Sequence, residues 1–378
     1  MAIHQHAADS VAADAERLIR LSEQLHAHPE TAWEEHRAAR WVAEALEEAG
    51  FAISSAYLGL DTAFHATYGS GPFRLGLCAE YDALPGLGHA CGHNLIAAIA
   101  VGAARALAPL ADTAGLTIEV YGTPAEEGGG GKIALLERGA FAGLDLAMMA
   151  HPAPVDVAEA EPFAVSHSHV TYRGKAAHAA AYPEQGINAA DAFVIAQVAI
   201  GLLRQQLPPT VRVHGVLTNG GEAPNAVPAR TEGRWYVRAE SLAQLAETEE
   251  KVWRCFAAGA LATGCELDIA PESKPYAEFR TYGPALRAYV RNAGQLGRTF
   301  DRNSPARRMN RASTDMGNVS QLVPAIHPYV GIGSLPALNH QPEFAARCVG
   351  ADAEKALLDA ATALAWTAID VAAEQTAR

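Results

Sequence analysis

In the first half of the chain, short apolar runs alternate with helical segments, and each run leads into polar or acidic residues. Residues 74–79, 116–121 and 144–150 have the length and composition of buried strands. Helical segments at 95–107 and 132–138 lie between them. Strands that alternate with helices in this way predict a largely parallel sheet covered by helices. The carboxyl ends of such strands share one edge of the sheet, where ligands bind in folds of this class.

A second pattern follows Pro162. Its order is strand, helix, strand, strand, helix, strand, which is typical of the split βαβ, or ferredoxin-like, arrangement. The segments are 165–172, 189–207, 211–217, 231–238, 242–262 and 267–270. From Pro284 the chain returns to helices, a buried strand at 327–332 and a closing helix at 351–374.

We therefore expect an α/β fold of two domains. Residues 1–163 and 279–378 form a catalytic domain with a mixed, mainly parallel sheet covered by helices. Residues 164–278 form an inserted α+β domain of the ferredoxin-like kind. The length of 378 residues is sufficient for two cores.

Composition restricts the possible partners. The net charge is −13, and such an acidic chain lacks the basic surface that nucleic acids and anionic membranes bind, so we expect neither. The N-terminus has no basic region followed by an apolar run, which predicts no secretory signal and a cytoplasmic protein. No apolar stretch is expected to span a bilayer, since Arg105 and Pro109 interrupt the closest candidate, residues 95–110. Five scattered cysteines indicate reduced thiols.

The segment HACGHN offers metal-binding groups. Cys91 and His93 are separated by Gly92, so a thiolate and an imidazole can reach one cation from a bent backbone. His89 is a third candidate, although support of the loop is the stronger expectation for it. A purely structural role for the whole segment is the alternative.

Glu126 and Glu127 follow a predicted strand and precede four glycines. Two adjacent carboxylates are costly to bury without a cation or a proton. A solvated acidic turn is the alternative, but glycines let the backbone approach a ligand closely. Neighbouring side chains point in different directions, so one carboxylate can bind a metal while the other takes a proton from water. A metal lowers the pKa of that water to about 7.

Three further histidines have a suggestive context. His151 ends a predicted strand and precedes a proline, although a core histidine bonded to backbone fits the same pattern. His178 lies among small residues of the inserted domain, where a substrate or another chain can approach. His340 follows the glycine-containing loop 331–334. The other histidines, His327 among them, have no such context and are expected to be structural or solvated.

Taken together, seven motifs resemble the aminoacylase/carboxypeptidase metallopeptidases (peptidase family twenty). The most similar branch contains the indole-acetyl-amino-acid hydrolases, aminobenzoyl-glutamate hydrolases and acyl-glutamine aminoacylases. The resemblance runs in the family's order from about His28 to Phe344, and the ordered set is far more specific than any one motif. The motifs are CAEYDALPGLGHACGHN, TPAEEGGGGK, AHP, GKAAHAAAYPEQGINAADA, GEAPNAVPAR, STDMGNVS and NHQPEF.

The resemblance implies one or two divalent metal ions per subunit, Zn²⁺ or Mn²⁺, in a dinuclear centre. A Cys/His/His set favours zinc, whereas a Glu/His site tolerates either metal. Cys91 is implied as the bridging ligand, His93 and His151 as the remaining ligands of one site, and Glu127 and His340 as those of the other.

The resemblance also implies roles around the metal. Glu126 would be the general base and acid, and Asp82 would orient a ligand. His178 of the inserted domain, which would act as a lid, would stabilise the oxyanion in the partner subunit's active site, so a homodimer through that domain is implied. Asn225 would contact substrate. Two positions depart from the auxin-conjugate hydrolases and other relatives: residue 94 is Asn rather than Asp, and residue 80 is Glu where Asp is frequent.

We therefore expect a metal-dependent amidohydrolase that cleaves the amide bond of N-acyl amino acids or small dipeptides. One alternative is a hydrolase of a non-peptide C–N bond, in an aromatic amine or carbamoyl substrate. Another is a non-catalytic, metal-stabilised binding subunit, which the intact set of proposed residues disfavours. A hydrolase with Cys91 as nucleophile would keep its activity in the presence of a chelator.

Overall fold

The computed structural model describes residues 2–300 and 305–376, and the chain divides into two compact units. Unit 1 comprises Met1–Pro162 and Phe279–Arg378, and unit 2 comprises Phe163–Glu278. Each unit has its own sheet and its own apolar core.

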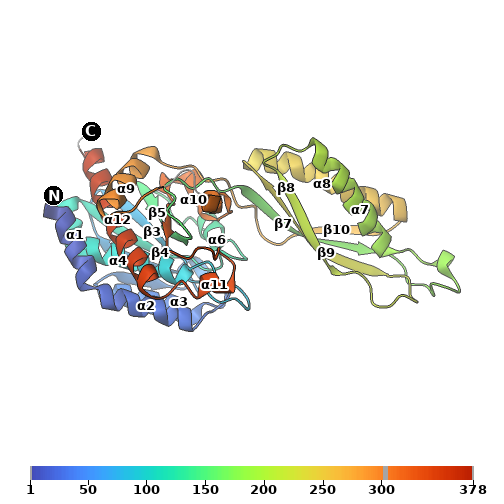
Figure 1. Ribbon diagram of the computed structural model, residues 1–378, viewed down its shortest axis with the longest axis horizontal. Coiled ribbons are helices and arrows are strands. Elements are labelled where there is room, and N and C mark those ends of the chain that lie inside the picture. Colours follow the sequence, from blue (N-terminus) through green and yellow to red (C-terminus); the bar gives the residue numbers. More distant parts are fainter. Residues whose placement is uncertain (1, 301–304, 377–378) are drawn as a thin grey trace. The chain divides into compact units, whose positions relative to one another are not determined.

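Unit 1 contains a six-stranded mixed sheet with the order β1-β2-β4-β3-β5-β11. Figure 1 labels three of its strands, β3, β4 and β5. The four strands from β4 to β11 are parallel, and β2 and β1 continue the sheet in antiparallel pairing. The predicted mainly parallel sheet is confirmed, with the antiparallel pair added at one side. The strands are β1 (Ala52–Ser55), β2 (Phe64–Gly69), β3 (Phe73–Ala79), β4 (Leu116–Gly122), β5 (Leu146–Met148) and β11 (Ala325–Ile326).

Helices cover both faces of this sheet, because successive side chains of its strands point to opposite sides. Leu75 and Leu77 of β3 face the larger core, which α4 (His93–Leu107) shares, whereas Cys78 faces a second core. The helix α12 (Ala351–Thr376) packs on α4 (Figure 1). The other α-helices of the unit are α1 (Ala2–Ala13), α2 (Ala15–Ala27), α3 (His36–Glu47), α5 (Ala111–Ala114), α6 (Gly131–Glu137), α9 (Gly283–Gln295), α10 (Met316–Leu322) and α11 (Pro342–Ala345).

Two predicted elements of unit 1 have different bounds in the structure. The predicted strand 327–332 was wrong in its bounds: β11 ends at Ile326, and β12 (Tyr329–Gly331) pairs with β6 (His151–Ala153) in a separate two-stranded sheet. Pro328 lies between them and has no N–H to donate to a ladder. The amphipathic pattern of residues 9–27 predicts one helix, but the structure has two, α1 and α2, which a turn at Asp14 separates.

Two helical stretches, His93–Ala114 and Ala351–Gln375, are long and apolar enough to cross a membrane. The expectation that no stretch reaches this length was wrong. Pro109 does not end the first stretch but sits at the start of a short 3₁₀ turn, Ala108–Leu110, which continues into α5. Protein covers 89% and 72% of their most apolar windows. Buried core helices pass the same test, so the finding is weak evidence for a membrane span.

Unit 2 has the predicted ferredoxin-like arrangement. Its four-stranded sheet has the order β10-β7-β9-β8, with every neighbouring pair antiparallel. Two helices pack against each other and bury Phe193 and Phe256 over the sheet. The elements are β7 (Ala164–Arg173), α7 (Ala189–Leu203), β8 (Arg212–Asn219), β9 (Arg230–Ala239), α8 (Leu242–Thr263) and β10 (Glu266–Pro271).

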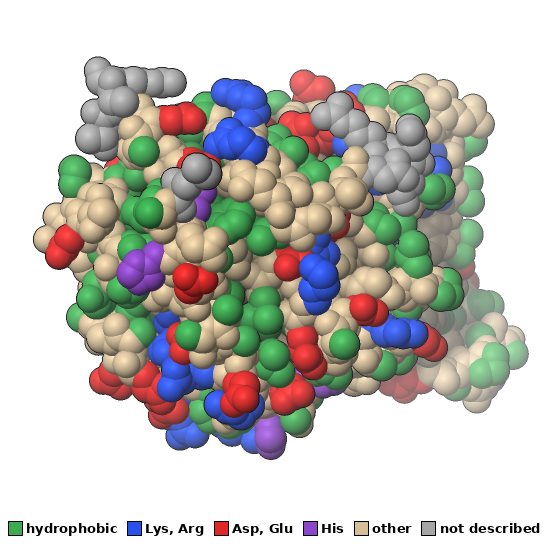
Figure 2. Space-filling model, turned by 60° about the vertical axis from the view of Figure 1, so that its left-hand side comes forward, with side chains coloured by type: hydrophobic (Ala, Val, Ile, Leu, Met, Phe, Trp, Pro, Cys, Tyr) green, Lys and Arg blue, Asp and Glu red, His purple; other side chains and the backbone are tan. Residues whose placement is uncertain are grey.

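The face drawn in Figure 2 carries acidic and basic side chains close together, with apolar side chains scattered between them. Exposed ion pairs within one helix, such as Arg20 with Glu16, also occur in the protein. The two signs are therefore interspersed on this face rather than collected in one field.

Candidate metal centre

The parallel strands bring the predicted chemical groups to one edge of the unit 1 sheet. Glu80 and Asp82 follow β3, Glu126 and Glu127 follow β4, and His151 lies three residues beyond the end of β5. All of these strands point the same way, so their carboxyl ends meet at this edge.

The loop before α4 supplies Cys91 and His93. Gly92 between them has φ 84° and forms the N-cap of the helix. A Cβ atom at this position would lie 2.9 Å from two atoms of the Pro152 side chain. Glycine therefore permits both the left-handed backbone and the close approach of β6, which carries His151.

The five predicted ligands lie together in two groups that share one thiol. The ligand atoms of Cys91, His93 and His151 all lie within 4.8 Å of one another, as do those of Cys91, Glu127 and His340. The Sγ atom of Cys91 is 3.5 Å from Nε2 of His151, and Nε2 of His340 is 3.4 Å from Oε1 of Glu127. A cation between such atoms is held at about 2.0 to 2.3 Å from each nitrogen, oxygen or sulfur.

The residues fit a divalent cation. Among the residues that the structure describes, Nε2 of His93 and Oε1 of Glu127 are buried without a hydrogen-bond partner. A buried polar atom without a partner costs free energy, which a bound cation would offset. Thiolate with two imidazoles is a zinc-binding set, and the Glu127 and His340 pair suits zinc or manganese.

Burial changes the proton affinities of these side chains. Burial lowers the pKa of His151 to about 3, and its Nδ1 atom bonds to the Pro152 carbonyl at 2.7 Å, so Nε2 presents a free lone pair toward Cys91. Burial raises the pKa of the Cys91 thiol well above its usual range. A cation would have to displace that proton, as metal binding by thiols generally does.

The two adjacent glutamates differ in the same way that their predicted roles do. Burial, with the nearby charges of Glu80 and Glu127, raises the pKa of Glu126 well above its usual range. Burial acts in the same direction on Glu127, but the contact of its carboxylate with the His340 ring and the charge of His93 outweigh it and hold that pKa below the ordinary value. One carboxylate is thus poised to carry a proton and the other to remain ionised.

Asp82 links both ligand groups. Its Oδ1 atom lies 2.9 Å from Nδ1 of His93, and its Oδ2 atom accepts the backbone N–H of Glu127 at 2.9 Å. The first contact leaves Nε2 of His93 directed toward the other ligands, which is the arrangement expected of a residue that orients a ligand.

A buried ionic network beside the centre was missed in the sequence. The ammonium group of Lys132 lies 2.5 Å from Oε1 of Glu80 and 2.6 Å from Oδ1 of Asp315, and all three side chains are buried. Glu80 also forms a third group of ligand atoms within 4.8 Å, together with His93 and Glu126. These residues come from three distant segments, so no local spacing could have predicted their pairing.

Two other buried groups were also missed. His327, which the sequence placed among the structural or solvated histidines, stacks on His151 with ring centroids 5.6 Å apart and is 1% exposed. Glu35 is fully buried and accepts the backbone N–H of Ala125 at 2.8 Å. The position of Glu35 directly before an amphipathic helix suggests a helix cap instead, so the sequence carries no signal for this contact.

The structure also accounts for residues that the sequence left between two interpretations. His89 belongs to none of the ligand groups and lies buried beside His26. The amide of Asn94 donates to Oγ of Ser22 and to the Cys348 carbonyl, each at 2.9 Å. An ionised carboxylate has no hydrogen to donate, so the amide at position 94 is what allows these two bonds.

In unit 2 the structure brings His178 and Asn225 together. The N–H of Ala179 donates to the Asn225 carbonyl at 3.0 Å, and His178 forms an isolated bridge with Ala226. Nδ1 of His178 accepts the N–H of Ala181 at 3.1 Å, which leaves Nε2–H as an exposed donor. Both side chains are exposed within the unit.

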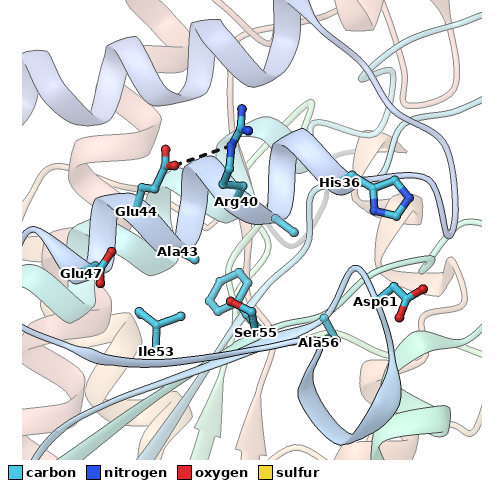
Figure 3. A pocket seen from close by; sticks show the side chains of 12 residues that line it. His36, Arg40, Ala43, Glu44, Glu47, Ile53, Ser55, Ala56 and Asp61 are labelled. Atoms are coloured by element: carbon cyan, nitrogen blue, oxygen red, sulfur yellow. Dashed lines mark ion pairs between the residues drawn. The ribbon is translucent and has the colours of Figure 1, made fainter.

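A pocket of about 430 Å³ lies elsewhere in unit 1, between α3 and the strands β1 and β2 (Figure 3). Arg40 and Glu44, which extend from α3 on the side away from Ile53 and Ser55 in this view, form an ion pair at 3.6 Å. Its lining contains none of the predicted metal ligands. The chemistry described above therefore does not extend to this pocket.

Comparison with known proteins agrees with this geometry. The family model described as peptidase family M20/M25/M40 matches residues 72–365. The Xaa-Arg dipeptidase of Mus musculus is 43% identical over 384 residues, which cover 98% of this chain and 89% of that protein. One of the subunits of the p-aminobenzoyl-glutamate hydrolase of Escherichia coli is 33% identical over 309 residues, which cover 75% and 64%.

The fold also matches a solved structure. A dinuclear metal-binding peptidase of the M20 family from Bacillus subtilis superposes with a TM-score of 0.71 at 23% identity, and the match covers 95% of this chain and 99% of that one. The family match covers most of the sequence, and the site geometry is that of a metal-assisted hydrolase. This chain therefore belongs to peptidase family M20/M25/M40 and is an enzyme of its metallopeptidase and amidohydrolase kind.

Proposed function

We propose that this protein is a metal-dependent dipeptidase whose preferred substrates carry a basic residue at the carboxyl end. The observation that carries the proposal is the 43% identity with an Xaa-Arg dipeptidase across 98% of the chain, together with the two ligand groups that share Cys91. The relative named for p-aminobenzoyl-glutamate suggests an aromatic amide as substrate. Because it matches a smaller share of this chain, we take this as the second candidate.

Two divalent cations, Zn²⁺ or Mn²⁺, would occupy the two groups. Cys91 would bridge them, His93 and His151 would complete one site, and Glu127 and His340 the other. A bound cation lowers the pKa of a coordinated water and polarises the amide carbonyl. The buried, unpartnered atoms of His93 and Glu127 support this assignment.

Glu126 would move the proton. Its burial and its neighbours raise its pKa, so it can accept a proton from the attacking water and deliver it to the leaving nitrogen. Its Oε2 atom is 3.9 Å from Nε2 of His93, a member of one of the two ligand groups. Asp82 would hold the ring of His93 in the orientation that this step requires.

His178 would stabilise the negative oxygen that forms during attack. Its Nδ1 atom is occupied as an acceptor, so Nε2–H is available as a donor. Asn225, next to it in the same unit, would contact the substrate.

Unit 2 would also join two subunits in a homodimer. Val194, Val198 and Leu202 repeat every four residues along α7 and are 58%, 59% and 63% exposed. They form an apolar stripe on one side of the helix. The neighbouring edge strand β8 exposes Val216 and Leu217 and has a free side for pairing. Apolar residues in such a patch commonly mark an interface.

The decisive experiment measures release of free amino acid from a panel of substrates: Xaa-Arg and Xaa-Lys dipeptides, Xaa-Leu dipeptides, N-acetyl amino acids and p-aminobenzoyl-glutamate. Each is assayed with the metal-loaded enzyme and again after a chelator. We expect chelator-sensitive turnover that is fastest for the dipeptides with a basic carboxyl-terminal residue.

The matched variant is Glu126→Gln, which keeps the shape of the side chain but cannot take up a proton. We expect it to retain metal and fold while losing about 100- to 10,000-fold in kcat. Faster release from p-aminobenzoyl-glutamate than from any dipeptide would favour the second candidate. Turnover that survives both chelation and the variant would exclude the mechanism.

A further inference from the structure

The connection between α2 and α3 contains two glutamates with different partners. Glu30 caps α3: its Oε2 atom accepts the N–H groups of Arg37 and Ala38 at 2.9 and 3.0 Å, and its Oε1 atom accepts from the Arg37 side chain at 2.7 Å. Glu35 occupies the N-cap position itself but makes no capping bond. Because Glu30 already satisfies the first turn, the Glu35 side chain can serve another purpose.

The Glu35 side chain instead contacts the loop that leads to the candidate metal centre. Glu35 is fully buried, and its Oε1 atom accepts the backbone N–H of Ala125 at 2.8 Å. Ala125 directly precedes Glu126 and has φ 56°, a left-handed conformation that residues other than glycine rarely adopt. Such a backbone persists when surrounding contacts hold it, and strain of this kind concentrates at functional sites.

Three alternate N–H groups anchor the segment that carries Glu126 and Glu127. Thr123 donates to the Ala79 carbonyl at 2.8 Å, Ala125 donates to Glu35, and Glu127 donates to Asp82 at 2.9 Å. The first acceptor is the end of a core strand, and the third is the residue that orients His93. Glu35 is therefore the middle anchor of this loop.

We propose that Glu35 is a positioning residue that directs Glu126 and Glu127 into the metal centre through the backbone of Ala125. This inference rests on the proposed function for the roles of those two glutamates. Glu35 belongs to none of the ligand groups, so its effect passes through the loop.

The arrangement predicts a selective effect on the two cations. Glu127 is a ligand of only one group, whereas Cys91, His93 and His151 come from the start of α4 and from β6, outside the loop that Glu35 anchors. Loss of the anchor should therefore loosen the cation at Glu127 and His340 and leave the other in place. General loss of stability would not distinguish the two sites.

The test compares variants that change the length of the Glu35 side chain separately from its charge. Glu35→Gln keeps the length and an oxygen acceptor but loses the charge. Glu35→Asp keeps the charge but withdraws the carboxylate by one methylene. Glu35→Ala removes both. The matched control is Glu30→Ala. It removes a carboxylate from the same connection, but that carboxylate bonds to α3 and not to the loop.

Metal release from each holoprotein is followed during titration with a chelator, in parallel with kcat and KM and with hydrogen exchange of residues 123–131. For Glu35→Ala and Glu35→Asp we expect one of the two ions to bind at least about 10-fold more weakly. We also expect faster exchange in the loop and a lower kcat with little change in KM. Glu35→Gln should resemble the wild type. Glu30→Ala should lower the Tm while both ions and the loop are unaffected.

Equal behaviour of Glu35→Asp and Glu35→Gln, or loop exchange in both that matches the wild type, would overturn the proposal. The proposal would also be overturned if Glu30→Ala weakened metal binding as much as Glu35→Ala does. If Glu35→Ala fails to fold, the Gln and Asp pair still decides the question. Metal release and hydrogen exchange need no turnover, so failure of the dipeptide assay with the wild type would reject the proposed function without touching this result.

Discussion

Asp82 contacts one residue from each ligand group: its Oδ1 atom lies 2.9 Å from Nδ1 of His93, and its Oδ2 atom accepts the N–H of Glu127 at 2.9 Å. Removal of such a partner typically weakens metal binding by about 10- to 100-fold. We expect Asp82→Ala to lose metal affinity by that factor, as measured by competition with a chelator. Asp145→Ala, which removes a carboxylate bonded to the N–H of Arg74, is the control. Unchanged metal affinity in Asp82→Ala would show that Asp82 does not support the metal ligands.

Lys132 neutralises two buried carboxylates, Glu80 and Asp315. Removing one partner from a buried ionic group costs about 3 to 5 kcal/mol, because it leaves an uncompensated charge. We expect Lys132→Met to lower the free energy of unfolding by that amount in urea titrations of the metal-free protein. The pair of Lys355 with Asp359 provides the control: Lys355 is 65% exposed, so Lys355→Met should cost less than about 1 kcal/mol. Equal losses in the two variants would mean that the buried network contributes no more than a surface pair.

Glu119 should make unit 1 sensitive to acid. Its side chain is 3% exposed and accepts hydrogen bonds from His65, Tyr121 and Arg74. Burial acts to raise the pKa of Glu119, but these partners outweigh it and lower the pKa to about 2. The folded-state value lies below the unfolded-state value near 4.5, so the stabilisation is complete above pH 4.5 and is lost as the pH falls toward 2.

The difference corresponds to roughly 3 kcal/mol at neutral pH. We expect Glu119→Gln to be less stable by about that amount at pH 7 and to lose less stability than the wild type between pH 5 and pH 2.5. Urea unfolding at a series of pH values measures both. Glu23→Gln, at an exposed position, should follow the wild-type curve. Parallel curves for Glu119→Gln and the wild type would show that this carboxylate does not govern the acid sensitivity.

Much of the fold follows from local pattern. The apolar runs predicted β3 and β4, because burial on both sides of a parallel strand leaves a strong mark on the sequence. The order of unit 2 was predicted from the alternation of its antiparallel strands with helical segments. The antiparallel strands β1 and β2 were not predicted, since partly exposed strands carry a weaker signal. On either side of Pro328, β11 joins the large sheet and β12 joins β6 in a separate sheet. Which sheet each strand joins is decided by the tertiary fold.

The site divides in the same way. Cys91, His93, Glu126 and Glu127 lie in short motifs. His151 and His340 were candidates from their context, and the resemblance to a family made them ligands. Lys132, Asp315 and Glu35 could not be found, because each acts through a partner that is far away in the sequence: Lys132 and Asp315 are 183 residues apart, and Glu35 and Ala125 are 90 residues apart. Pairing at that distance is decided by the fold.

If the apolar stripe on α7 forms the dimer interface, a charge placed in it should dissociate the subunits. Val198 lies in the middle of it and is 59% exposed. A charge placed at the centre of an apolar interface has to be desolvated without a partner. We expect Val198→Asp to change a dimer into a monomer in size-exclusion chromatography with light scattering. Leu261→Asp on α8, where the native side chain is 87% exposed, is the control and should remain dimeric. A dimeric Val198→Asp would place the interface elsewhere.

His178 provides the last test, because the proposed dimer would bring it to the active site of the other subunit. His178→Ala and Glu126→Ala should each be inactive alone. In a mixed dimer, one of the two sites then combines Glu126 from one chain with His178 from the other. Random exchange of equal amounts makes half of the dimers mixed, so about a quarter of all sites should be complete. Activity near a quarter of the wild-type level, with exchange verified by two different tags, is the expected result. If verified exchange restores no activity, His178 acts within its own chain, and the catalytic need for the dimer disappears even though the apolar stripe still joins the subunits.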